Sequence, residues 1–156
     1  MQPPFLAHFE TFWSPHPHRE CRLSDKEVIV FEPCSKKQGA DERVHRMKLH
    51  YEPYEMIKSG KKTIELRLFD EKRQMIKIGD VIAFINTKTG EELCTRVLNL
   101  HRFDSFADLY KALPLLKCGY TEDDIDTASP LDMEQYYSQE EQKKYGVLGI
   151  ELCLIS

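Results

Sequence analysis

The sequence lacks several features that would assign a function quickly. No apolar run approaches the roughly 18 residues of a membrane-spanning helix, which excludes a spanning protein. There is no phosphate-binding loop of the Gly-x-x-x-x-Gly-Lys-Ser/Thr type, no Gly-x-Gly-x-x-Gly and no nucleophile elbow. The sequence therefore has no motif for ordinary nucleotide hydrolysis, for nicotinamide chemistry or for the commonest esterase mechanism.

Paired cysteines and a secretion signal are also missing. Five cysteines are scattered along the chain, and no two have the Cys-x-x-Cys spacing of a zinc or thioredoxin-type site. Cys94 and Cys153 lie in apolar runs, which predicts reduced thiols. The first 30 residues contain no basic start followed by an apolar stretch, so we expect a cytoplasmic location. His8, His16 and His18 have no suitably spaced Cys or acidic ligand, and we expect neither a metal nor a cofactor.

Length and composition indicate one compact domain, or one domain with an extension. The chain has 156 residues, of which 41% are hydrophobic, enough for a genuine core. Its composition changes near Met47: the first 46 residues hold five of the eight prolines and little apolar pattern. We therefore predict an N-terminal extension over residues 1–46, partly disordered, with at best one edge strand at Glu27–Phe31, and a domain over residues 47–156. A start codon placed upstream of the true start at Met47 would explain the same change.

Periodicity after Met47 predicts a series of short strands with a few helices between them. Thr63–Phe69 alternates with period two, so Ile64, Leu66 and Leu68 face one way while Glu65 and Arg67 face the other. The predicted strands are Met47–His50, Thr63–Phe69, Val81–Ile85, Glu92–His101 and Gly146–Ile155; the predicted helices are Tyr51–Ser59, a segment capped by Asp104 or Ser105 and ending at Leu113, and Pro130–Tyr145. The order contains hairpins and lacks a regular strand-helix alternation, which favours an α+β fold: a small mixed or antiparallel β-barrel of about five or six strands with about three helices.

The distribution of charge is more informative than its total. The chain carries 22 basic and 26 acidic residues, a net charge of −4, which argues against a uniformly basic nucleic-acid binder. Lys58–Lys77 nevertheless has a local charge of +4, whereas Thr121–Tyr145 has −6. A basic segment at a helix-to-strand junction can hold phosphate, although such a mixture of charges can also be a solvated surface.

Glu65 and Arg67 are two residues apart on one strand and share a face. They can pair with one another, or present an acceptor and a fork of donors to a base edge or a phosphate. Lys61 or Lys62 would lie at the rim of the same surface. A structural ion-pair ladder is the alternative, and spacing alone does not separate the two.

The segment Gly60-Lys61-Lys62-Thr63-Ile64-Glu65-Leu66-Arg67 resembles the Gly-x-Lys-x-x-Glu-x-Arg signature of the ASCH domain, a member of the PUA-like superfamily. Its surroundings agree: an apolar helix precedes the glycine, Arg73 lies in the following loop, Ile78-Gly79-Asp80 leads into a strand, and Tyr145–Ile150 begins a closing strand. The resemblance covers about Met47–Ile155.

This resemblance implies a PUA-like β-barrel flanked by helices, with a cleft beside the first helix that binds RNA or nucleotides. It assigns the ligand contacts to Gly60, Lys61, Lys62, Glu65, Arg67 and Arg73, with Gly60 making the turn. Lys62 and Arg67 would contact phosphate or base, and Glu65 would orient Arg67 or accept from a base amino group. Lys62 is out of phase with the strand, so this convergence requires it to lie in the preceding turn.

The same cleft could belong to an enzyme, in which case Lys62 and Glu65 are the candidate catalytic residues. Amidohydrolases of this fold that act on acetylcytidine carry Thr at the position of Glu65, where a threonine oxygen could be the nucleophile. The present chain lacks that nucleophile, and its nearest threonine, Thr63, is two positions away. A metal-independent ribonuclease could use Glu65 as base, Lys62 or Arg67 as cation and His101 as acid.

Aromatic residues could stack on a base, and the candidates are Tyr51, Tyr54, Phe69 and Phe103. A third possibility is a protein-interaction module, because ASCH domains also occur in transcriptional coactivators. The expected partner is RNA or a nucleotide-like ligand, with no membrane involved and a protein partner as the alternative.

Overall fold

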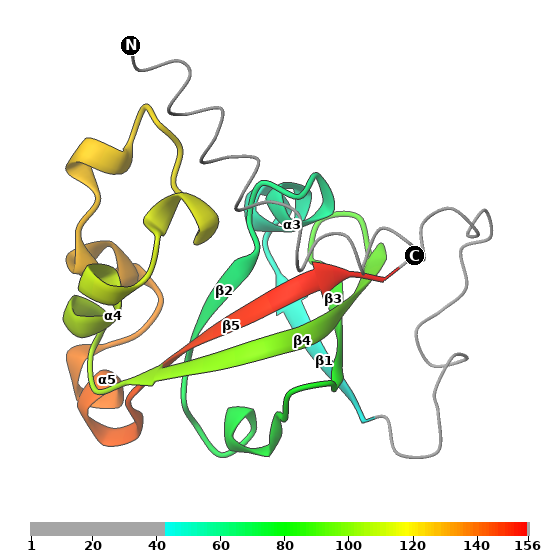
Figure 1. The fold of residues 1–156 in the computed structure, drawn as a ribbon, viewed down its shortest axis with the longest axis horizontal. Coiled ribbons are helices and arrows are strands. Elements are labelled where there is room, and N and C mark those ends of the chain that lie inside the picture. Colours follow the sequence, from blue (N-terminus) through cyan, green and yellow to red (C-terminus); the bar gives the residue numbers. More distant parts are fainter. Residues whose placement is uncertain (1–42, 156) are drawn as a thin grey trace, which may run out of the picture.

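The fold is a five-stranded sheet that curls into a half-barrel, with helices packed around it (Figure 1). The computed structural model describes residues 43–155, so the predicted strand at Glu27–Phe31 and the histidines at positions 8, 16 and 18 lie outside the described residues. The strand order is β1-β3-β4-β5-β2. The strands are β1 (Val44–Leu49), β2 (Ile64–Leu68), β3 (Val81–Asn86), β4 (Glu92–Phe103) and β5 (Val147–Leu154).

The sheet is mixed. β1 runs parallel to β3, whereas the β3–β4, β4–β5 and β2–β5 pairs are antiparallel. This architecture confirms the predicted α+β fold with a small mixed barrel. Each predicted strand after Met47 is present, and β1 begins at Val44, three residues earlier than expected. The boundary of the domain at Met47 stays a prediction.

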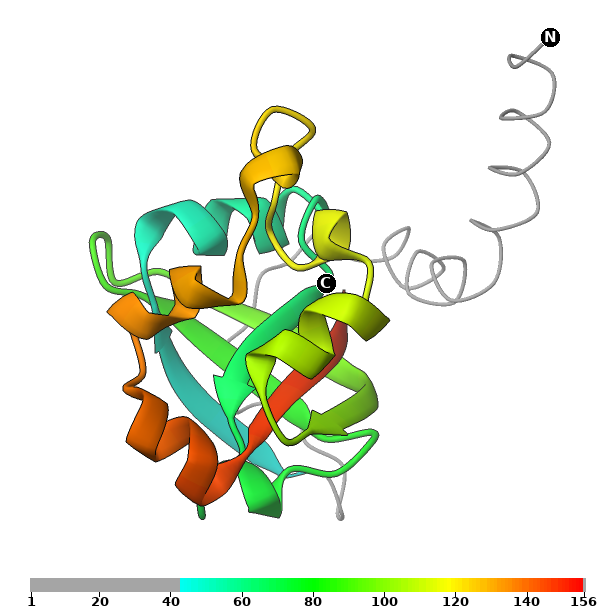
Figure 2. The same cartoon turned by 90° about the vertical axis from the view of Figure 1, so that its left-hand side faces the viewer.

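Residues 43–155 contain three short α-helices. They are α3 (Tyr51–Lys58), α4 (Phe106–Ala112) and α5 (Gln139–Tyr145), and the 3-10 helices are η2 (Arg73–Met75), η3 (Leu115–Lys117), η4 (Ile125–Thr127) and η5 (Pro130–Gln135). α4 and α5 begin at serine caps, whereas α3 has no side-chain cap bond. Ser105 caps α4 by accepting a hydrogen bond from the backbone N–H of Asp108. In Figure 2, α4, η5 and α5 lie on the side of β2 and β5, while α3 lies at one end of the sheet.

The prediction of a single helix over Pro130–Tyr145 is wrong, because the segment divides into η5 and α5. Ser138 adopts an extended conformation and starts a second helix with a capping box, in which Glu141 hydrogen-bonds back to Ser138. Ser129 and Asp132 form an equivalent box at the start of η5. Each capping box begins its own helix, so the segment contains two helices.

The core divides between the two faces of the sheet. The concave face packs against α3 and contains the buried Tyr54, Ile57, Phe84 and Ile150. The face against α4 contains Ile64, Leu66 and Leu68 of β2, as its alternation predicted. Glu65 and Arg67 therefore project toward the concave face.

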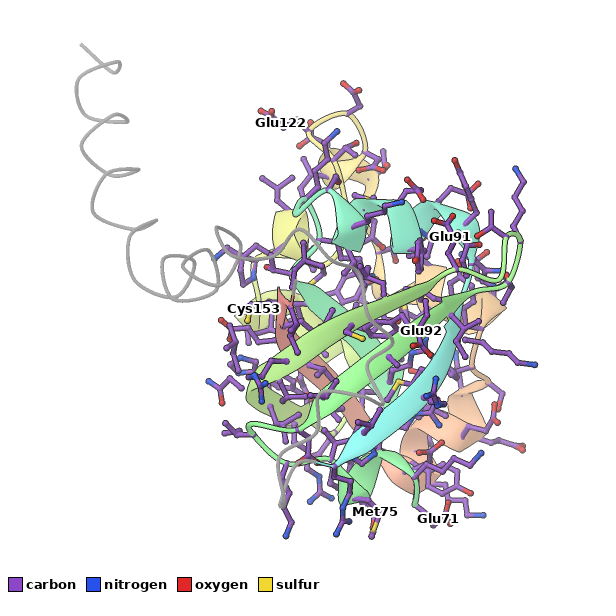
Figure 3. The ribbon with its side chains drawn as sticks, turned by 90° about the vertical axis from the view of Figure 1, so that its right-hand side faces the viewer. Glu71, Met75, Glu91, Glu92, Glu122 and Cys153 are labelled. Atoms are coloured by element: carbon purple, nitrogen blue, oxygen red, sulfur yellow. The ribbon has the colours of Figure 1, made fainter. Side chains whose placement is uncertain are left out.

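Three described cysteines lie in this framework. Cys94 and Cys153 each take part in a disulfide bond, so the prediction of reduced thiols is wrong for these two positions. Cys118 is free and buried. Figure 3 shows Cys153 on β5 and Glu92 at the start of β4, from which Glu92 reaches across β3 to pair with Arg46 of β1.

The described part of the chain contains no helix with the length and apolar character needed to span a bilayer.

Candidate functional site

A buried carboxylate with two cationic partners lies at the centre of the motif. Glu65 is 4% exposed, and each of its oxygens is paired. The Lys62 ammonium lies 3.0 Å from Oε1, while Arg67 approaches Oε2 with Nη2 at 2.9 Å and Nε at 3.0 Å. The three side chains predicted to converge do so, and together they carry a net charge of +1.

The turn between α3 and β2 brings Lys62 to Glu65. Gly60 takes a φ of +84°, and the backbone N–H groups of Lys61 and Lys62 both donate to the Met56 carbonyl, which wraps the chain around the end of α3. Lys62 precedes the first residue of β2, as the convergence required. Its ammonium also donates to the Cys118 carbonyl at 2.9 Å and packs against Gly119.

Arg67 connects the two edges of the sheet. β1 and β2 are the terminal strands in the sheet order, and Arg67 of β2 donates from Nη2 to the carbonyl of Lys48 in β1 at 2.9 Å. One guanidinium thus joins the motif carboxylate to the opposite edge strand. A planar group with several fixed donors suits this role better than an ammonium would.

These contacts hold Glu65 ionised. Burial alone would raise the pKa of this carboxyl, but the charges and hydrogen bonds of Lys62 and Arg67 outweigh desolvation and lower it to about 2. Burial opposes the charged form of Arg67 too, yet Glu65 and Tyr137 raise its pKa above the usual value. Glu65 is therefore an anion at every physiological pH, and a poor proton acceptor.

Lys62, Glu65 and Arg67, the buried triad, form part of the wall of a pocket of about 650 Å³. A cavity of this size is typical of small-molecule sites. The pocket lies between the start of α3, the motif, and the segment from Tyr110 to Tyr137. Its lining residues are Lys48, Leu49, His50, Glu52, Pro53, Met56, Lys62, Glu65, Leu66, Arg67, Thr87, Tyr110, Cys118, Gly119, Tyr120, Asp124, Asp132, Met133, Gln135, Tyr136 and Tyr137.

The lining is close to electrically neutral, unlike the basic cleft that the sequence suggested. Its described residues include three Lys or Arg side chains and four carboxylates. Five of the seven basic residues in Lys58–Lys77 are outside the lining, and only Lys62 and Arg67 belong to it. Two of the four carboxylates, Asp124 and Asp132, come from the acidic segment.

Four tyrosines give the pocket an aromatic character that the sequence did not reveal. The hydroxyls of Tyr110 and Tyr120 lie 2.8 Å apart, and Tyr120 donates to Asp132 at 2.6 Å. The hydrogen bond from Tyr120 and the backbone N–H of Ser129 lower the pKa of Asp132. These residues are more than 40 positions from the motif, and no local pattern links them to it.

Several predicted ligand contacts lie away from the pocket. Lys61 is exposed and outside the lining, and Gly60 shapes the turn without bordering the pocket. Arg73 donates to Asp70 at 2.7 Å in the loop after β2 and does not line the pocket, although its charge acts on Tyr137.

His101 is not placed to act as an acid beside Glu65. Glu65 pairs with Ile150, and Ile150 pairs with Leu100 on the next strand, so these three share a face. His101 follows Leu100 and projects from the opposite face, where its ring lies 3.0 Å from Glu151. Thr63 is also outside the lining.

None of the aromatic residues proposed for stacking lines the pocket. Tyr54 is 1% exposed within the core, and Phe103 packs in the cluster under α4. Phe69 is covered by Arg102, whose guanidinium lies 4.4 Å from the ring centre, and Tyr51 contacts Lys88. Within residues 43–155, no three His, Cys, Asp or Glu side chains cluster closely enough to hold a metal ion.

Two solved structures resemble the chain in both sequence and fold. Hypothetical protein PH0355 is 35% identical with a TM-score of 0.59, and the match covers 72% of this chain and all of that one. Protein PF0455 from Pyrococcus furiosus is 35% identical with a TM-score of 0.58, covering 73% of this chain and 99% of the other.

A mutant of ZmASCH from Zymomonas mobilis shares the fold at 15% identity, with a TM-score of 0.52 over 72% of this chain and 68% of that protein. None of the curated proteins is similar enough to count as a match. The model of the ASCH domain matches residues 47–156. With the half-barrel fold and the two relatives at 35% identity, this match shows that the chain belongs to the ASCH domain family.

Proposed function

We propose that this ASCH domain binds RNA, or a nucleotide-like ligand, by taking one nucleoside unit into the pocket beside α3. The observation that carries the proposal is that Lys62, Glu65 and Arg67 line a 650 Å³ pocket together with four tyrosines. RNA is recognised chiefly through unstacked bases, which bind to aromatic faces and to fixed donors and acceptors. Both kinds of group are present here.

The charge of the lining defines the part of the ligand that enters. A wall with three cations and four carboxylates offers little attraction to a run of phosphates. A neutral base with its sugar fits such a surface better, and Lys62 and Lys48 can contact one adjacent phosphate. We therefore expect a single unit to be enclosed, with any further RNA outside the pocket.

The arrangement favours binding over hydrolysis. Glu65 has both oxygens paired and a pKa lowered to about 2, so it is a weak general base at neutral pH. The candidate acid, His101, projects from the opposite face of the sheet. Burial raises the pKa of the Cys118 thiol, which lines the pocket, to about 11, and this makes it a poor nucleophile.

The test is binding of fluorescently labelled single-stranded RNAs of roughly eight nucleotides, a length typical of small β-barrel modules. Free nucleosides, acetylcytidine included, are measured beside them by calorimetry, and each mixture is assayed for product. Lys62→Met removes a charge from the pocket wall, and Lys61→Met removes its exposed neighbour as the matched control. We expect Lys62→Met to weaken binding at least ten-fold and Lys61→Met to change it less than three-fold.

Lys48→Met provides a second probe of the pocket wall that leaves the buried triad intact. Equal losses in the lysine variants at 61 and 62 would indicate diffuse surface attraction and contradict a pocket site. Product formation would assign an enzyme to the same cleft. If no RNA or nucleoside binds the wild-type chain, the proposal is wrong and a protein partner becomes the leading alternative.

A further inference from the structure

Two exposed rings border the mouth of the pocket. His50 precedes α3, and Tyr136 follows η5. Their ring centroids lie 6.4 Å apart with an angle of 38° between the planes, and both residues line the pocket. They come from segments more than 80 residues apart, so the tertiary fold alone brings them together.

Tyr136 differs from the other pocket tyrosines in having an accessible ring. It is 55% exposed. Tyr137 stacks on Phe106 of the core, with centroids 6.1 Å apart and planes at 16°. Tyr110 and Tyr120 meet edge to face and use their hydroxyls on one another and on Asp132.

His50 has fewer ring contacts than Tyr136, whose ring also contacts the Tyr137 ring with centroids 6.4 Å apart and planes at 55°. It occupies the cap position of α3 without a side-chain capping bond. Within residues 43–155, its ring has no hydrogen bond or ion pair, and the contact with Tyr136 is its one ring contact. An exposed imidazole without a capping role and facing a tyrosine ring is available for stacking.

The spacing of the two rings is close to that of a base sandwich. Bases in a helix repeat about every 3.4 Å along the strand, so a base between two rings needs about 7 Å between their centres. The rings here are 6.4 Å apart and tilted. An increase of roughly 0.6 Å in the distance between the centroids and a rotation toward parallel would admit a planar base, and side-chain adjustments of this kind are common at interfaces on binding.

We propose that His50 and Tyr136 form a two-ring clamp that holds one nucleobase by stacking at the mouth of the pocket. This inference rests on the proposed function and names two positioning residues for it. The clamp favours an unstacked base over a duplex, because paired bases cannot enter between the rings. It also tolerates different bases, since every base has a π-face.

The test uses single-stranded RNA in which one base is replaced by 2-aminopurine, whose fluorescence falls when the base stacks. We expect quenching on binding to the wild-type chain. Tyr136→Leu and His50→Leu, which remove a ring, should each weaken binding about ten-fold, within the range measured for loss of one stacked base, and abolish the quenching. Tyr136→Phe and His50→Phe restore a ring and should restore the quenching.

Tyr51→Leu is the matched control, because Tyr51 is 39% exposed next to His50 but does not line the pocket. It should leave affinity and quenching within two-fold of wild type. All three tyrosine or histidine positions are on the surface, and thermal unfolding of each variant verifies that the fold is intact.

The outcomes separate this inference from the function on which it rests. RNA affinity that is unchanged in both leucine variants, or wild-type binding without quenching, overturns the clamp and leaves the pocket function standing. Quenching retained in the leucine variants also overturns it. Absence of any RNA binding by the wild-type chain refutes the pocket function, and the clamp with it.

Discussion

The ammonium of Lys62 lies 3.0 Å from the carboxylate of Glu65, and both side chains are more than nine-tenths buried. Lys62 belongs to the turn after α3 and Glu65 to β2, so this contact fixes how the helix joins the sheet. Arg67 completes the set by reaching the opposite edge strand. The motif thus shapes the pocket wall and stabilises the barrel at the same time.

We predict that Glu65→Gln destabilises the protein strongly. The substitution leaves Lys62 and Arg67 as two buried cations without their shared anion, and breaking such a buried set typically costs about 3–5 kcal/mol. Urea unfolding at neutral pH measures the change in the free energy of unfolding. Glu91→Gln is the control, because Glu91 is exposed and pairs with Lys58 at 3.5 Å. This substitution should lower the free energy of unfolding by less than about 1 kcal/mol. Similar values for the two variants would contradict a structural role for Glu65.

The stabilisation from Glu65 should depend on pH in the acid range. Its folded-state pKa, about 2, is below the ordinary value of 4.5. A carboxyl whose pKa is lowered by folding stabilises the protein above the ordinary pKa and loses that contribution as pH falls toward the folded value. The difference in unfolding free energy between wild type and Glu65→Gln should therefore be constant from pH 7 to pH 5 and shrink between about pH 4.5 and pH 2. A difference that is independent of pH across this range would rule out the pairing.

Tyr120→Phe should destabilise the pocket wall more than Tyr110→Phe. Tyr120 bonds to both the Tyr110 hydroxyl and the Asp132 carboxylate, whereas Tyr110 has only the first of these contacts. Hydrogen bonds to a charged group contribute more than neutral ones, so we expect losses of about 1–3 kcal/mol for Tyr120→Phe and about 0.5–1.5 kcal/mol for Tyr110→Phe. Thermal unfolding of the two variants gives the order, and a reversed order would contradict this network.

We expect Gly119→Ala to cost more than Gly60→Ala. Both glycines have positive φ, which costs a side chain about 1–2 kcal/mol. A Cβ at Gly60 meets open space, whereas one at Gly119 would lie 3.2 Å from the Lys62 ammonium and 3.3 Å from its Cδ. The excess at Gly119 should come from displacing Lys62.

A double-mutant cycle checks this origin. In a Lys62→Ala background the obstructing side chain is gone, and the cost of Gly119→Ala should fall to that of Gly60→Ala. If Gly119→Ala still costs more than Gly60→Ala in the Lys62→Ala background, the extra cost arises from the backbone conformation of Gly119 instead.

Local patterns predicted most of the elements because each has a local cause. The period-two run around Glu65 predicts β2 and its two faces, and Gly60 predicts the end of α3. The division of Pro130–Tyr145 was missed although its signal was present, since Ser138 and Glu141 have the spacing of a capping box. The composition of the whole segment is typical of a helix, and it was therefore interpreted as one helix without a second start at Ser138.

The lining of the pocket is only partly predictable from local patterns. The sequence correctly brought Lys62, Glu65 and Arg67 together, because they are five residues apart and one turn places them. It predicted a basic cleft from Lys58–Lys77, but charges that are close in sequence project in different directions, and most of them lie outside the lining. Composition along a segment does not determine which side chains share a cavity.

The sequence by itself determined the elements of the half-barrel and the three charged residues of the motif, because periodicity, caps and short spacing act over a few residues. Only the tertiary structure decided what surrounds that motif. The packing of distant segments placed Lys48 against Arg67, Tyr120 and Asp132 in the same pocket lining as Glu65, and His50 beside Tyr136. Contacts between distant segments depend on how whole helices and strands pack, and local sequence patterns do not predict that packing.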